Sequence, residues 1–235
     1  MGWLAPAPAV AQTAKSRGTV YANGGYQTGT ESMTVTGTIV ANADTGSFTS
    51  TFKPKSGTSI DVGGSARVWK ALSVGVAYTT FSADGQPDVS AEIPHPFFFN
   101  QPRSVSGQVG VSRSEKAFHI RAVFTSAPGK KIQFSAFGGP VVFSVTQDVV
   151  TGVSYSDAYP YDSATFASAS TKQVSQSKTG FGGGADVAYY FTDHIGLGAS
   201  ATLAKATITT AQSDGTSLSI KVGGAIVGIG LRVRF

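Results

Sequence analysis

The chain has 235 residues, a formal net charge of +5 and no cysteine, and only 13% of its residues are charged. Soluble domains contain about 25% charged residues, so a soluble β-protein, which must wet one face of every strand, is disfavoured. The lack of cysteine excludes disulfides and thiolate metal sites. Lys and Arg are scattered along the chain, whereas a nucleic-acid surface would cluster them.

The hydrophobic pattern favours a membrane-spanning β-barrel over a helical membrane protein. No stretch approaches the roughly 20 apolar residues that a transmembrane helix needs. In a barrel, residues facing lipid alternate with residues facing the lumen, which keeps the average hydropathy near zero. The mean hydropathy of +0.05 fits this pattern.

The N-terminal segment resembles the end of a secretory signal. The small residues around Val10 in Ala9-Val10-Ala11 predict cleavage before Gln12. The basic and apolar regions that should precede this site are very short, so a flexible leader is the alternative. We therefore expect residues 1–17 to be a signal remnant or leader and residues 18–235 to form one barrel domain.

Period-two alternation of apolar residues predicts eight strands. Short connections at 70–71, 128–129 and 192–193 alternate with the long segments 82–114 and 146–177, as in outer-membrane barrels with periplasmic turns and extracellular loops. A short tip at 212–216 joins the last two strands. In chain order the predicted strands are 18–27 (with 33–40 as a candidate continuation), 58–69, 72–81, 115–126, 131–145, 178–191, 195–210 and 217–235.

The sequence leaves the number of strands open, and the apolar parity of two predicted strands changes along their length. Val105, Val109 and Val111 alternate, which permits a ten-stranded barrel, although we favour an upward extension of the strand at 115–126. The apolar parity of the fifth strand changes at Gly138-Gly139-Pro140, where we predict a β-bulge. A second change of parity falls at Gly223-Gly224.

The C-terminal strand carries a recognisable signature. Its alternating apolar residues end in an aromatic residue, which resembles the signal by which bacterial barrel-assembly machinery recognises its clients. With the eight-strand pattern and the strand-turn-strand run 182–197, the chain resembles the small OmpA/OmpW-type outer-membrane barrels. Residues 93–100 resemble a loop of uncharacterised outer-membrane barrel proteins. The signature residues are Val227, Ile229, Leu231, Val233 and Phe235.

This resemblance implies an all-β fold, namely an antiparallel eight-stranded up-and-down transmembrane barrel with long extracellular loops. It implies a bacterial outer-membrane location and contact with outer-membrane lipid, lipopolysaccharide and the assembly machinery. It says little about function, because one fold hosts many roles.

Charged residues on the inward parity predict a polar cluster in the lumen. Buried charges persist only when they are paired and hydrogen-bonded, so we expect Asp186 to pair with Arg121 or Arg232. Asp61 should likewise pair with a basic neighbour. Eight strands leave an interior that side chains fill, which favours a polar plug over a narrow conduit. The predicted cluster is Asp61, Arg67, His119, Arg121, Asp186, Arg232 and Arg234.

The sequence favours a non-enzymatic structural or surface-interaction role, with surface proteins as possible partners. It contains no Gly-x-Ser-x-Gly elbow and no convergent metal-ligand pattern, so we expect no catalytic residues, metal or cofactor. The alternative is OmpW-like passive transport of small hydrophobic molecules, which a lateral gap beside Pro140 or Gly223 would favour; an outer-membrane enzyme is the least favoured reading. The residues expected at an extracellular apolar funnel or cap are Ile93, His95, Phe97, Phe98 and Phe99.

Overall fold

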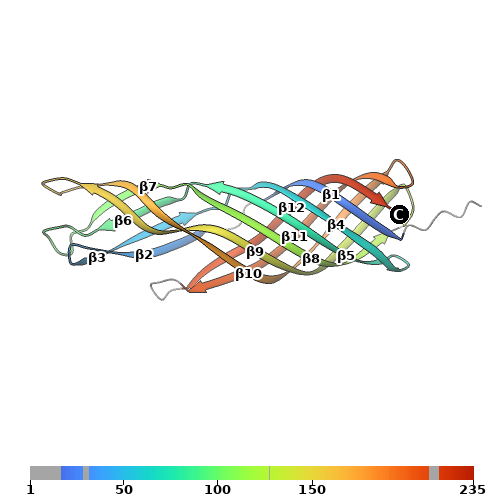
Figure 1. The fold of residues 1–235 in the computed structure, drawn as a ribbon, viewed down its shortest axis with the longest axis horizontal. Coiled ribbons are helices and arrows are strands. Elements are labelled where there is room, and N and C mark those ends of the chain that lie inside the picture. The colour runs from blue at the N-terminus through green and yellow to red at the C-terminus, as the bar shows by residue number, and fades with distance from the viewer. Residues whose placement is uncertain (1–16, 29–31, 127, 212–216) are drawn as a thin grey trace, which may run out of the picture.

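The computed structural model describes residues 17–28, 32–126, 128–211 and 217–235. The predicted leader at 1–17, except for Arg17, and the predicted tip at 212–216 lie outside these residues. Two antiparallel sheets make up the described chain (Figure 1). Its strands are β1 (Gly18–Gln27), β2 (Met33–Ala41), β3 (Asp44–Phe52), β4 (Gly57–Trp69), β5 (Leu72–Gly85), β6 (Asp88–Ile93), β7 (Arg103–Gln108), β8 (Val111–Ser126), β9 (Ile132–Asp157), β10 (Ala164–Tyr190), β11 (Ile195–Ala211) and β12 (Ser217–Arg234).

Eight of these strands close into a barrel in the order β1-β12-β11-β10-β9-β8-β5-β4. The first and last strands of the chain pair from Thr19↔Arg234 to Gln27↔Ile226. On its other side β1 pairs with β4, so the ring has no free edge. The predicted eight-stranded up-and-down barrel and its closure are therefore confirmed.

The outer wall of the barrel is apolar, because alternate residues of each strand point away from the lumen. On β12, Ile229 is 73% exposed, and on β10 Phe181 is 74% exposed. Such an outward apolar band is typical of strands that cross a lipid bilayer. None of the described residues form a helix long and apolar enough to cross a membrane. Further exposed apolar residues of this wall are Val74, Val76, Phe118, Ile120, Phe134, Leu197, Leu203, Val227, Leu231, Val233 and Phe235.

Ile229→Arg should lower the free energy of unfolding by about 2–4 kcal/mol, the cost of a cation near the middle of the bilayer. Ile229 lies between Gly24 and Ala199 on the outer wall, well away from both ends of β12. Urea unfolding in lipid vesicles, followed by tryptophan fluorescence, measures the change. Thr171→Arg, at an exposed site on the far part of β10, serves as the control. A fully tolerated Ile229→Arg would show that this wall does not face lipid.

A second sheet, in the order β2-β3-β6-β7, stands beyond the end of the barrel opposite the short turns (Figure 1). We call the end of the barrel that carries the second sheet the loop end, and the end with the short turns the turn end. Residues 33–40 do not continue β1, because β2 pairs with β3 from Met33↔Phe52 to Ala41↔Asp44. The predicted loop at 82–114 contains the β6–β7 hairpin. Val105 lies in β7 and Val111 opens β8, so the alternating valines divide between two sheets and add no strand to the barrel.

Strands β9 and β10 run far beyond the barrel and support the second sheet. Their ladder continues to Ala164↔Asp157, so the segment 146–177 is a strand extension rather than the predicted loop. In this extension, only the face of β9 and β10 that packs on the second sheet needs apolar residues. Thr and Val favour β-strands and therefore suit its extended backbone. The core between the layers contains Phe48, Val89, Ala91, Ile93, Val105 and Val150, with Val153, Tyr155 and Phe166 packed against it.

The predicted bulge at Gly138-Gly139-Pro140 is wrong. The β8–β9 register is the same at His119↔Val141 and Ala122↔Gly138, and the β9–β10 register is unbroken there. Val141 and Phe143 are buried, whereas Phe134 is 61% exposed. The apolar residues of β9 therefore move from the outer face to the inner face toward the loop end, because their surroundings change while the strand keeps its register at 138–141.

Candidate functional site: the polar network of the barrel lumen

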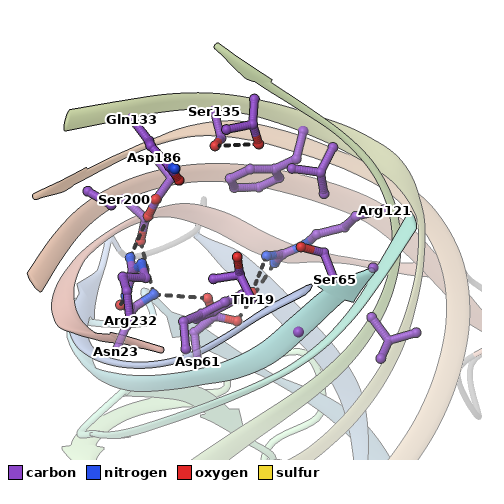
Figure 2. A pocket seen from close by; sticks show the side chains of 18 of the residues that line it. Thr19, Asn23, Asp61, Ser65, Arg121, Gln133, Ser135, Asp186, Ser200 and Arg232 are labelled. Carbon is purple, nitrogen blue, oxygen red and sulfur yellow. Dashed lines mark hydrogen bonds and ion pairs between the residues drawn. The ribbon is translucent and has the colours of Figure 1, made fainter. Parts of the chain in front are cut away.

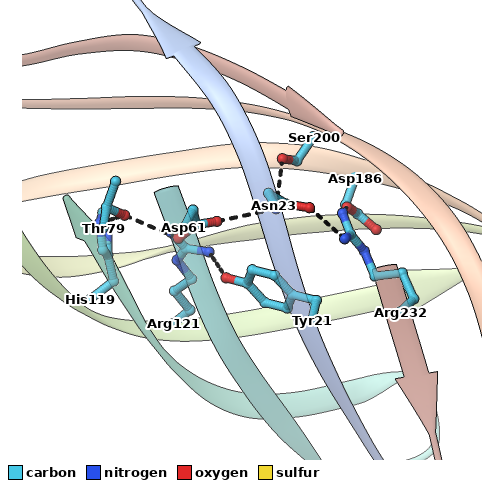
Figure 3. Close-up of polar contacts among 9 residues, drawn as sticks. All are labelled: Tyr21, Asn23, Asp61, Thr79, His119, Arg121, Asp186, Ser200 and Arg232. Atoms are coloured by element: carbon cyan, nitrogen blue, oxygen red, sulfur yellow. Dashed lines mark hydrogen bonds and ion pairs between the residues drawn. The ribbon is translucent and has the colours of Figure 1, made fainter. Parts of the chain in front are cut away.

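The lumen near the turn end is filled by a network centred on Arg232 of β12 (Figure 3). This guanidinium is 2% exposed and forms an ion pair with Asp186 of β10. Arg232 also donates to the side-chain oxygen of Asn23 on β1. Asn23 in turn donates to Ser200 of β11 at 3.2 Å. Arg232 and Asn23 together thus connect side chains from four strands.

A second group of the same network surrounds Asp61 of β4. Arg121 lies 3.7 Å from this carboxylate and donates to the Tyr21 hydroxyl. Thr79 donates to Asp61 at 3.0 Å and lies 3.1 Å from His119 Nε2. Asn23 is 3.4 Å from Asp61, which connects this group to that of Arg232. The charges therefore alternate across the lumen and are paired.

A separate polar cluster closes the lumen nearer the loop end. Arg113 forms a 2.7 Å ion pair with Glu115, and their side chains are 1% and 4% exposed. Arg113 also donates to Gln147 at 2.8 Å. The backbone N–H of Gly223 donates to Glu115 at 3.0 Å. Gly223 has a φ of 87°, and a Cβ there would lie 2.1 Å from the Ala204 carbonyl oxygen, so only glycine fits this position.

Apolar side chains lie on both sides of this cluster, with Ala117, Val141 and Phe143 toward the network of Arg232 and Met33 and Val111 toward the loop end. They come from the inner faces of β8, β9, β11 and β12 and from the first hairpin of the second sheet. Among the described residues, two polar groups thus cross the lumen, and an apolar layer encloses the one that contains Arg113. The apolar layer contains Met33, Val35, Phe52, Val111, Ala117, Val141, Phe143, Val145, Ala204, Ile208 and Val222.

A cavity among the polar residues of the lumen has a volume of about 70 Å³. Figure 2 shows Asp186, Ser200 and Arg232 on one side of it and Ser65 and Arg121 on another. A buried water needs roughly 10–15 Å³ of such space. The cavity accordingly has room for a few waters, and the side chains around it occupy much of this part of the lumen.

The structure brings together five of the seven residues predicted for the lumen cluster: Asp61, His119, Arg121, Asp186 and Arg232. Arg234 is buried but separate, donating to the carbonyls of Asp193 and Lys130 beneath the Tyr190 ring. Arg67 is half-buried, and its Nη1 has no hydrogen-bond partner among the described residues. Asp186 pairs with Arg232, one of its two expected partners.

Sequence reasoning missed the Arg113–Glu115 pair. The strand was expected to begin at residue 115, which left Arg113 in a loop. The missed signal was parity, since Arg113 and Glu115 share the inward face of His119 and Arg121 on β8. Asn23 and Gln147 were also missed, because neutral amides carry no charge pattern to mark them.

The loop end closes in an aromatic tip, formed by Phe97, Phe98, Phe99, Tyr159 and Tyr161. Phe97, Phe98 and Phe99 are 65%, 54% and 68% exposed. His95 is buried beneath them and accepts hydrogen bonds from the backbone of Phe97 and Phe98. The rings of Phe97 and Tyr161 pack edge to face, with their centroids 5.5 Å apart. Ile93, by contrast, is fully buried in the second core and lines no surface.

Solved structures share this architecture. OprG, an outer membrane protein from Pseudomonas aeruginosa, is 14% identical over 95% of this chain and 98% of its own, with a TM-score of 0.50. Neisserial surface protein A is 12% identical over 93% of this chain and 97% of its own, with a TM-score of 0.48. The chain has the fold of a small outer-membrane β-barrel. No protein-family model matches the sequence, and neither does any curated protein.

The histidines of this outer-membrane-type barrel lie in three different places. His95 is under the aromatic tip, His119 is in the lumen, and His194 is in a turn, 3.0 Å from the Arg234 carbonyl. Across the described ranges, no three His, Asp or Glu side chains converge as a metal site would require.

Proposed function

We propose that this chain is a plugged, non-enzymatic barrel of the bacterial outer membrane with a structural or surface-interaction role. The filled lumen carries the proposal, because paired charges and an apolar layer occupy the space that a solute would need. The turn end would face the periplasm and the loop end the exterior. The barrel wall would contact outer-membrane lipid and lipopolysaccharide, and the C-terminal strand would be the segment recognised by the assembly machinery.

The two-layered extension supports an interaction role at the cell surface. β7 is joined to the end of β9 by the 2.8 Å ion pair of Arg103 with Asp157. Arg103 also donates to the Tyr161 and Pro94 carbonyls, which fixes both loops of the aromatic tip. The tip is thus a supported apolar surface, and we propose that it contacts a partner outside the cell.

Replacing Phe97, Phe98 and Phe99 together by serine should change the free energy of unfolding by less than about 0.5 kcal/mol per site, as is usual for exposed positions. Ile93→Ala, in the core directly beside them, should cost about 2–5 kcal/mol. Thermal and urea unfolding of the two variants provide the comparison. A tip variant that loses as much stability as Ile93→Ala would make these phenylalanines structural and would remove them as a contact surface.

We expect the purified barrel to form no steady nanosiemens-scale channel in planar bilayers. The reason is spatial, since the charges of the lumen are tolerated only through their partners, and these paired side chains and the apolar layer occupy the lumen. Long recordings at both voltage polarities test this. Stable large openings would refute the plug, whereas rare or small openings agree with it.

Lateral transport of small hydrophobic molecules is the second candidate function. The β10–β11 ladder stops at Phe181↔Lys205, yet β10 continues to Ala164 and β11 to Ala211. Lys205 also pairs with Gly223, so the β10–β11 ladder ends beside one of the two positions where a lateral gap would favour transport. The apolar layer behind this seam opposes free passage. Uptake of a lipophilic dye by proteoliposomes at protein-free rates would exclude transport.

A further inference from the structure

Two lysines project from the outer wall at the edge of the apolar band nearer the loop end. Lys205 of β11 pairs with Gly223, and Lys221 of β12 pairs with Thr207, so the two lysines are diagonal neighbours on one face. Such positions lie about 7–8 Å apart. Both side chains are exposed and line a hollow of about 400 Å³ whose other described lining residues, among them Thr28 and Leu203, include no Asp or Glu.

A shallow trough lies directly beneath this hollow on the lipid-facing wall. Its volume is about 860 Å³, and its floor is made by Gly24, Ala185, Ala199 and Ala201. These residues come from β1, β10 and β11, where larger side chains would have filled the space. The pair Leu203↔Ala225 lines the hollow, and the next outward pair, Ala201↔Val227, lines the trough, so the two form one column along β11 and β12.

We propose that this column binds one anionic phosphorylated lipid of the surrounding leaflet. Its phosphate would lie between Lys205 and Lys221, and one acyl chain would lie in the trough. Lysine is a common point-charge partner for phosphate. The floor of the trough consists of glycine and alanine at bilayer depth, where a flexible hydrocarbon chain restores the packing contacts that a void forfeits.

The position of the column relative to the bilayer also favours a lipid over a soluble anion. Leu203 belongs to the apolar outer wall, and Lys205 is the next outward residue on β11, so the charges begin where the hydrocarbon ends. A free phosphate would use only the hollow and would leave the trough unexplained. The inference rests on the proposed membrane location but requires neither a plugged lumen nor transport.

Native mass spectrometry of the detergent-purified chain with bis-phosphorylated lipid A tests the proposal. We expect one retained lipid, and at least tenfold weaker retention in the double variant Lys205→Gln/Lys221→Gln. The double variant Lys130→Gln/Lys131→Gln removes the same charge from exposed residues at the turn end and should bind as the wild type does. Equal losses of lipid retention in the two double variants would mean that net charge alone explains the effect, and this result would overturn the site.

Further measurements test the trough and the lysine hollow separately and distinguish the classes of lipid that could be bound. Ala201→Leu should narrow the trough and weaken lipid retention, whereas Ala122→Leu, on the outer wall of β8, should not. Phosphatidylglycerol retained with the same lysine dependence would support the site and name a phospholipid as its source. If dephosphorylated lipid A is retained as well as bis-phosphorylated lipid A, the lysine hollow is refuted as a phosphate site. Displacement by inorganic phosphate at equal concentration would refute the trough. Unchanged bilayer conductance in all variants keeps this test separate from that of the plug.

Discussion

Arg113→Met should lower the free energy of unfolding by about 3–5 kcal/mol, the usual cost of leaving a buried charge without its partner. Glu115 is 4% exposed and has no other cation within ion-pair distance among the described residues. Its remaining donors are Gly223 N–H at 3.0 Å and Gln27 at 3.5 Å. Two neutral donors do not replace a guanidinium. Reversible urea unfolding in lipid vesicles measures the loss.

Adding Glu115→Gln to Arg113→Met should recover most of that stability. The amide oxygen still accepts from Gly223, while the uncompensated charge disappears. The apolar layer beside the pair, which includes Val111 and Phe143, accommodates a methionine. Glu115→Gln alone should cost less than Arg113→Met, because a buried guanidinium retains Gln147 and the Lys221 carbonyl as acceptors. A double variant as unstable as Arg113→Met would show that lost packing, and not charge, explains the effect.

The barrel was predictable because lipid imposes a strict rule on its strands. Every outward residue between the two interfaces must be apolar, so period-two alternation marks these strands individually. The closing ladder of β1 with β12 followed from the count of strands and the terminal signature. The pairing of Asp186 with Arg232 followed from parity and from the high cost of an isolated buried charge.

The second sheet was not predictable by the same reasoning. Its strands stand in water on one side and pack on the other, and many positions are Ser, Thr or Gly. A single apolar face needs few residues, as the burial of only Val35 and Phe48 near the middle of the first hairpin illustrates. The pairing of β3 with β6 joins segments about 40 residues apart, from Ser47↔Glu92 to Thr51↔Asp88. No local pattern encodes that contact.

The false bulge at Gly138-Gly139-Pro140 shows a limit of parity itself. A change in which face is apolar has two physical causes, either an extra residue in the strand or a change in what surrounds it. The second cause holds in β9, where Phe134 faces outward and Phe143 faces a dry interior. The sequence alone does not distinguish these two causes, because the apolar surroundings of β9 lie outside the barrel near the turn end and inside it nearer the loop end.

Arg232→Met should destabilise the barrel by about 3 kcal/mol, near the lower end of the range for a broken buried pair. Asp186 is less enclosed than Glu115, with a side chain 18% exposed, so water in the adjoining cavity can solvate part of its charge. Asn23 loses a donor as well, although it keeps its contacts with Ser200 and Asp61. Unfolding in lipid vesicles measures this cost.

The matched control is the double variant Arg232→Met/Asp186→Asn, which removes both charges and keeps the volume of the plug. It should be more stable than Arg232→Met alone, and its bilayer conductance should remain that of the wild type. Arg232→Met alone should instead show raised leakage, because water must enter to solvate the unpaired carboxylate. If Arg232→Met unfolds at the wild-type urea concentration and stays silent in bilayers, then the Arg232 group is not what holds the plug together, and the Arg113 layer closes the lumen without it.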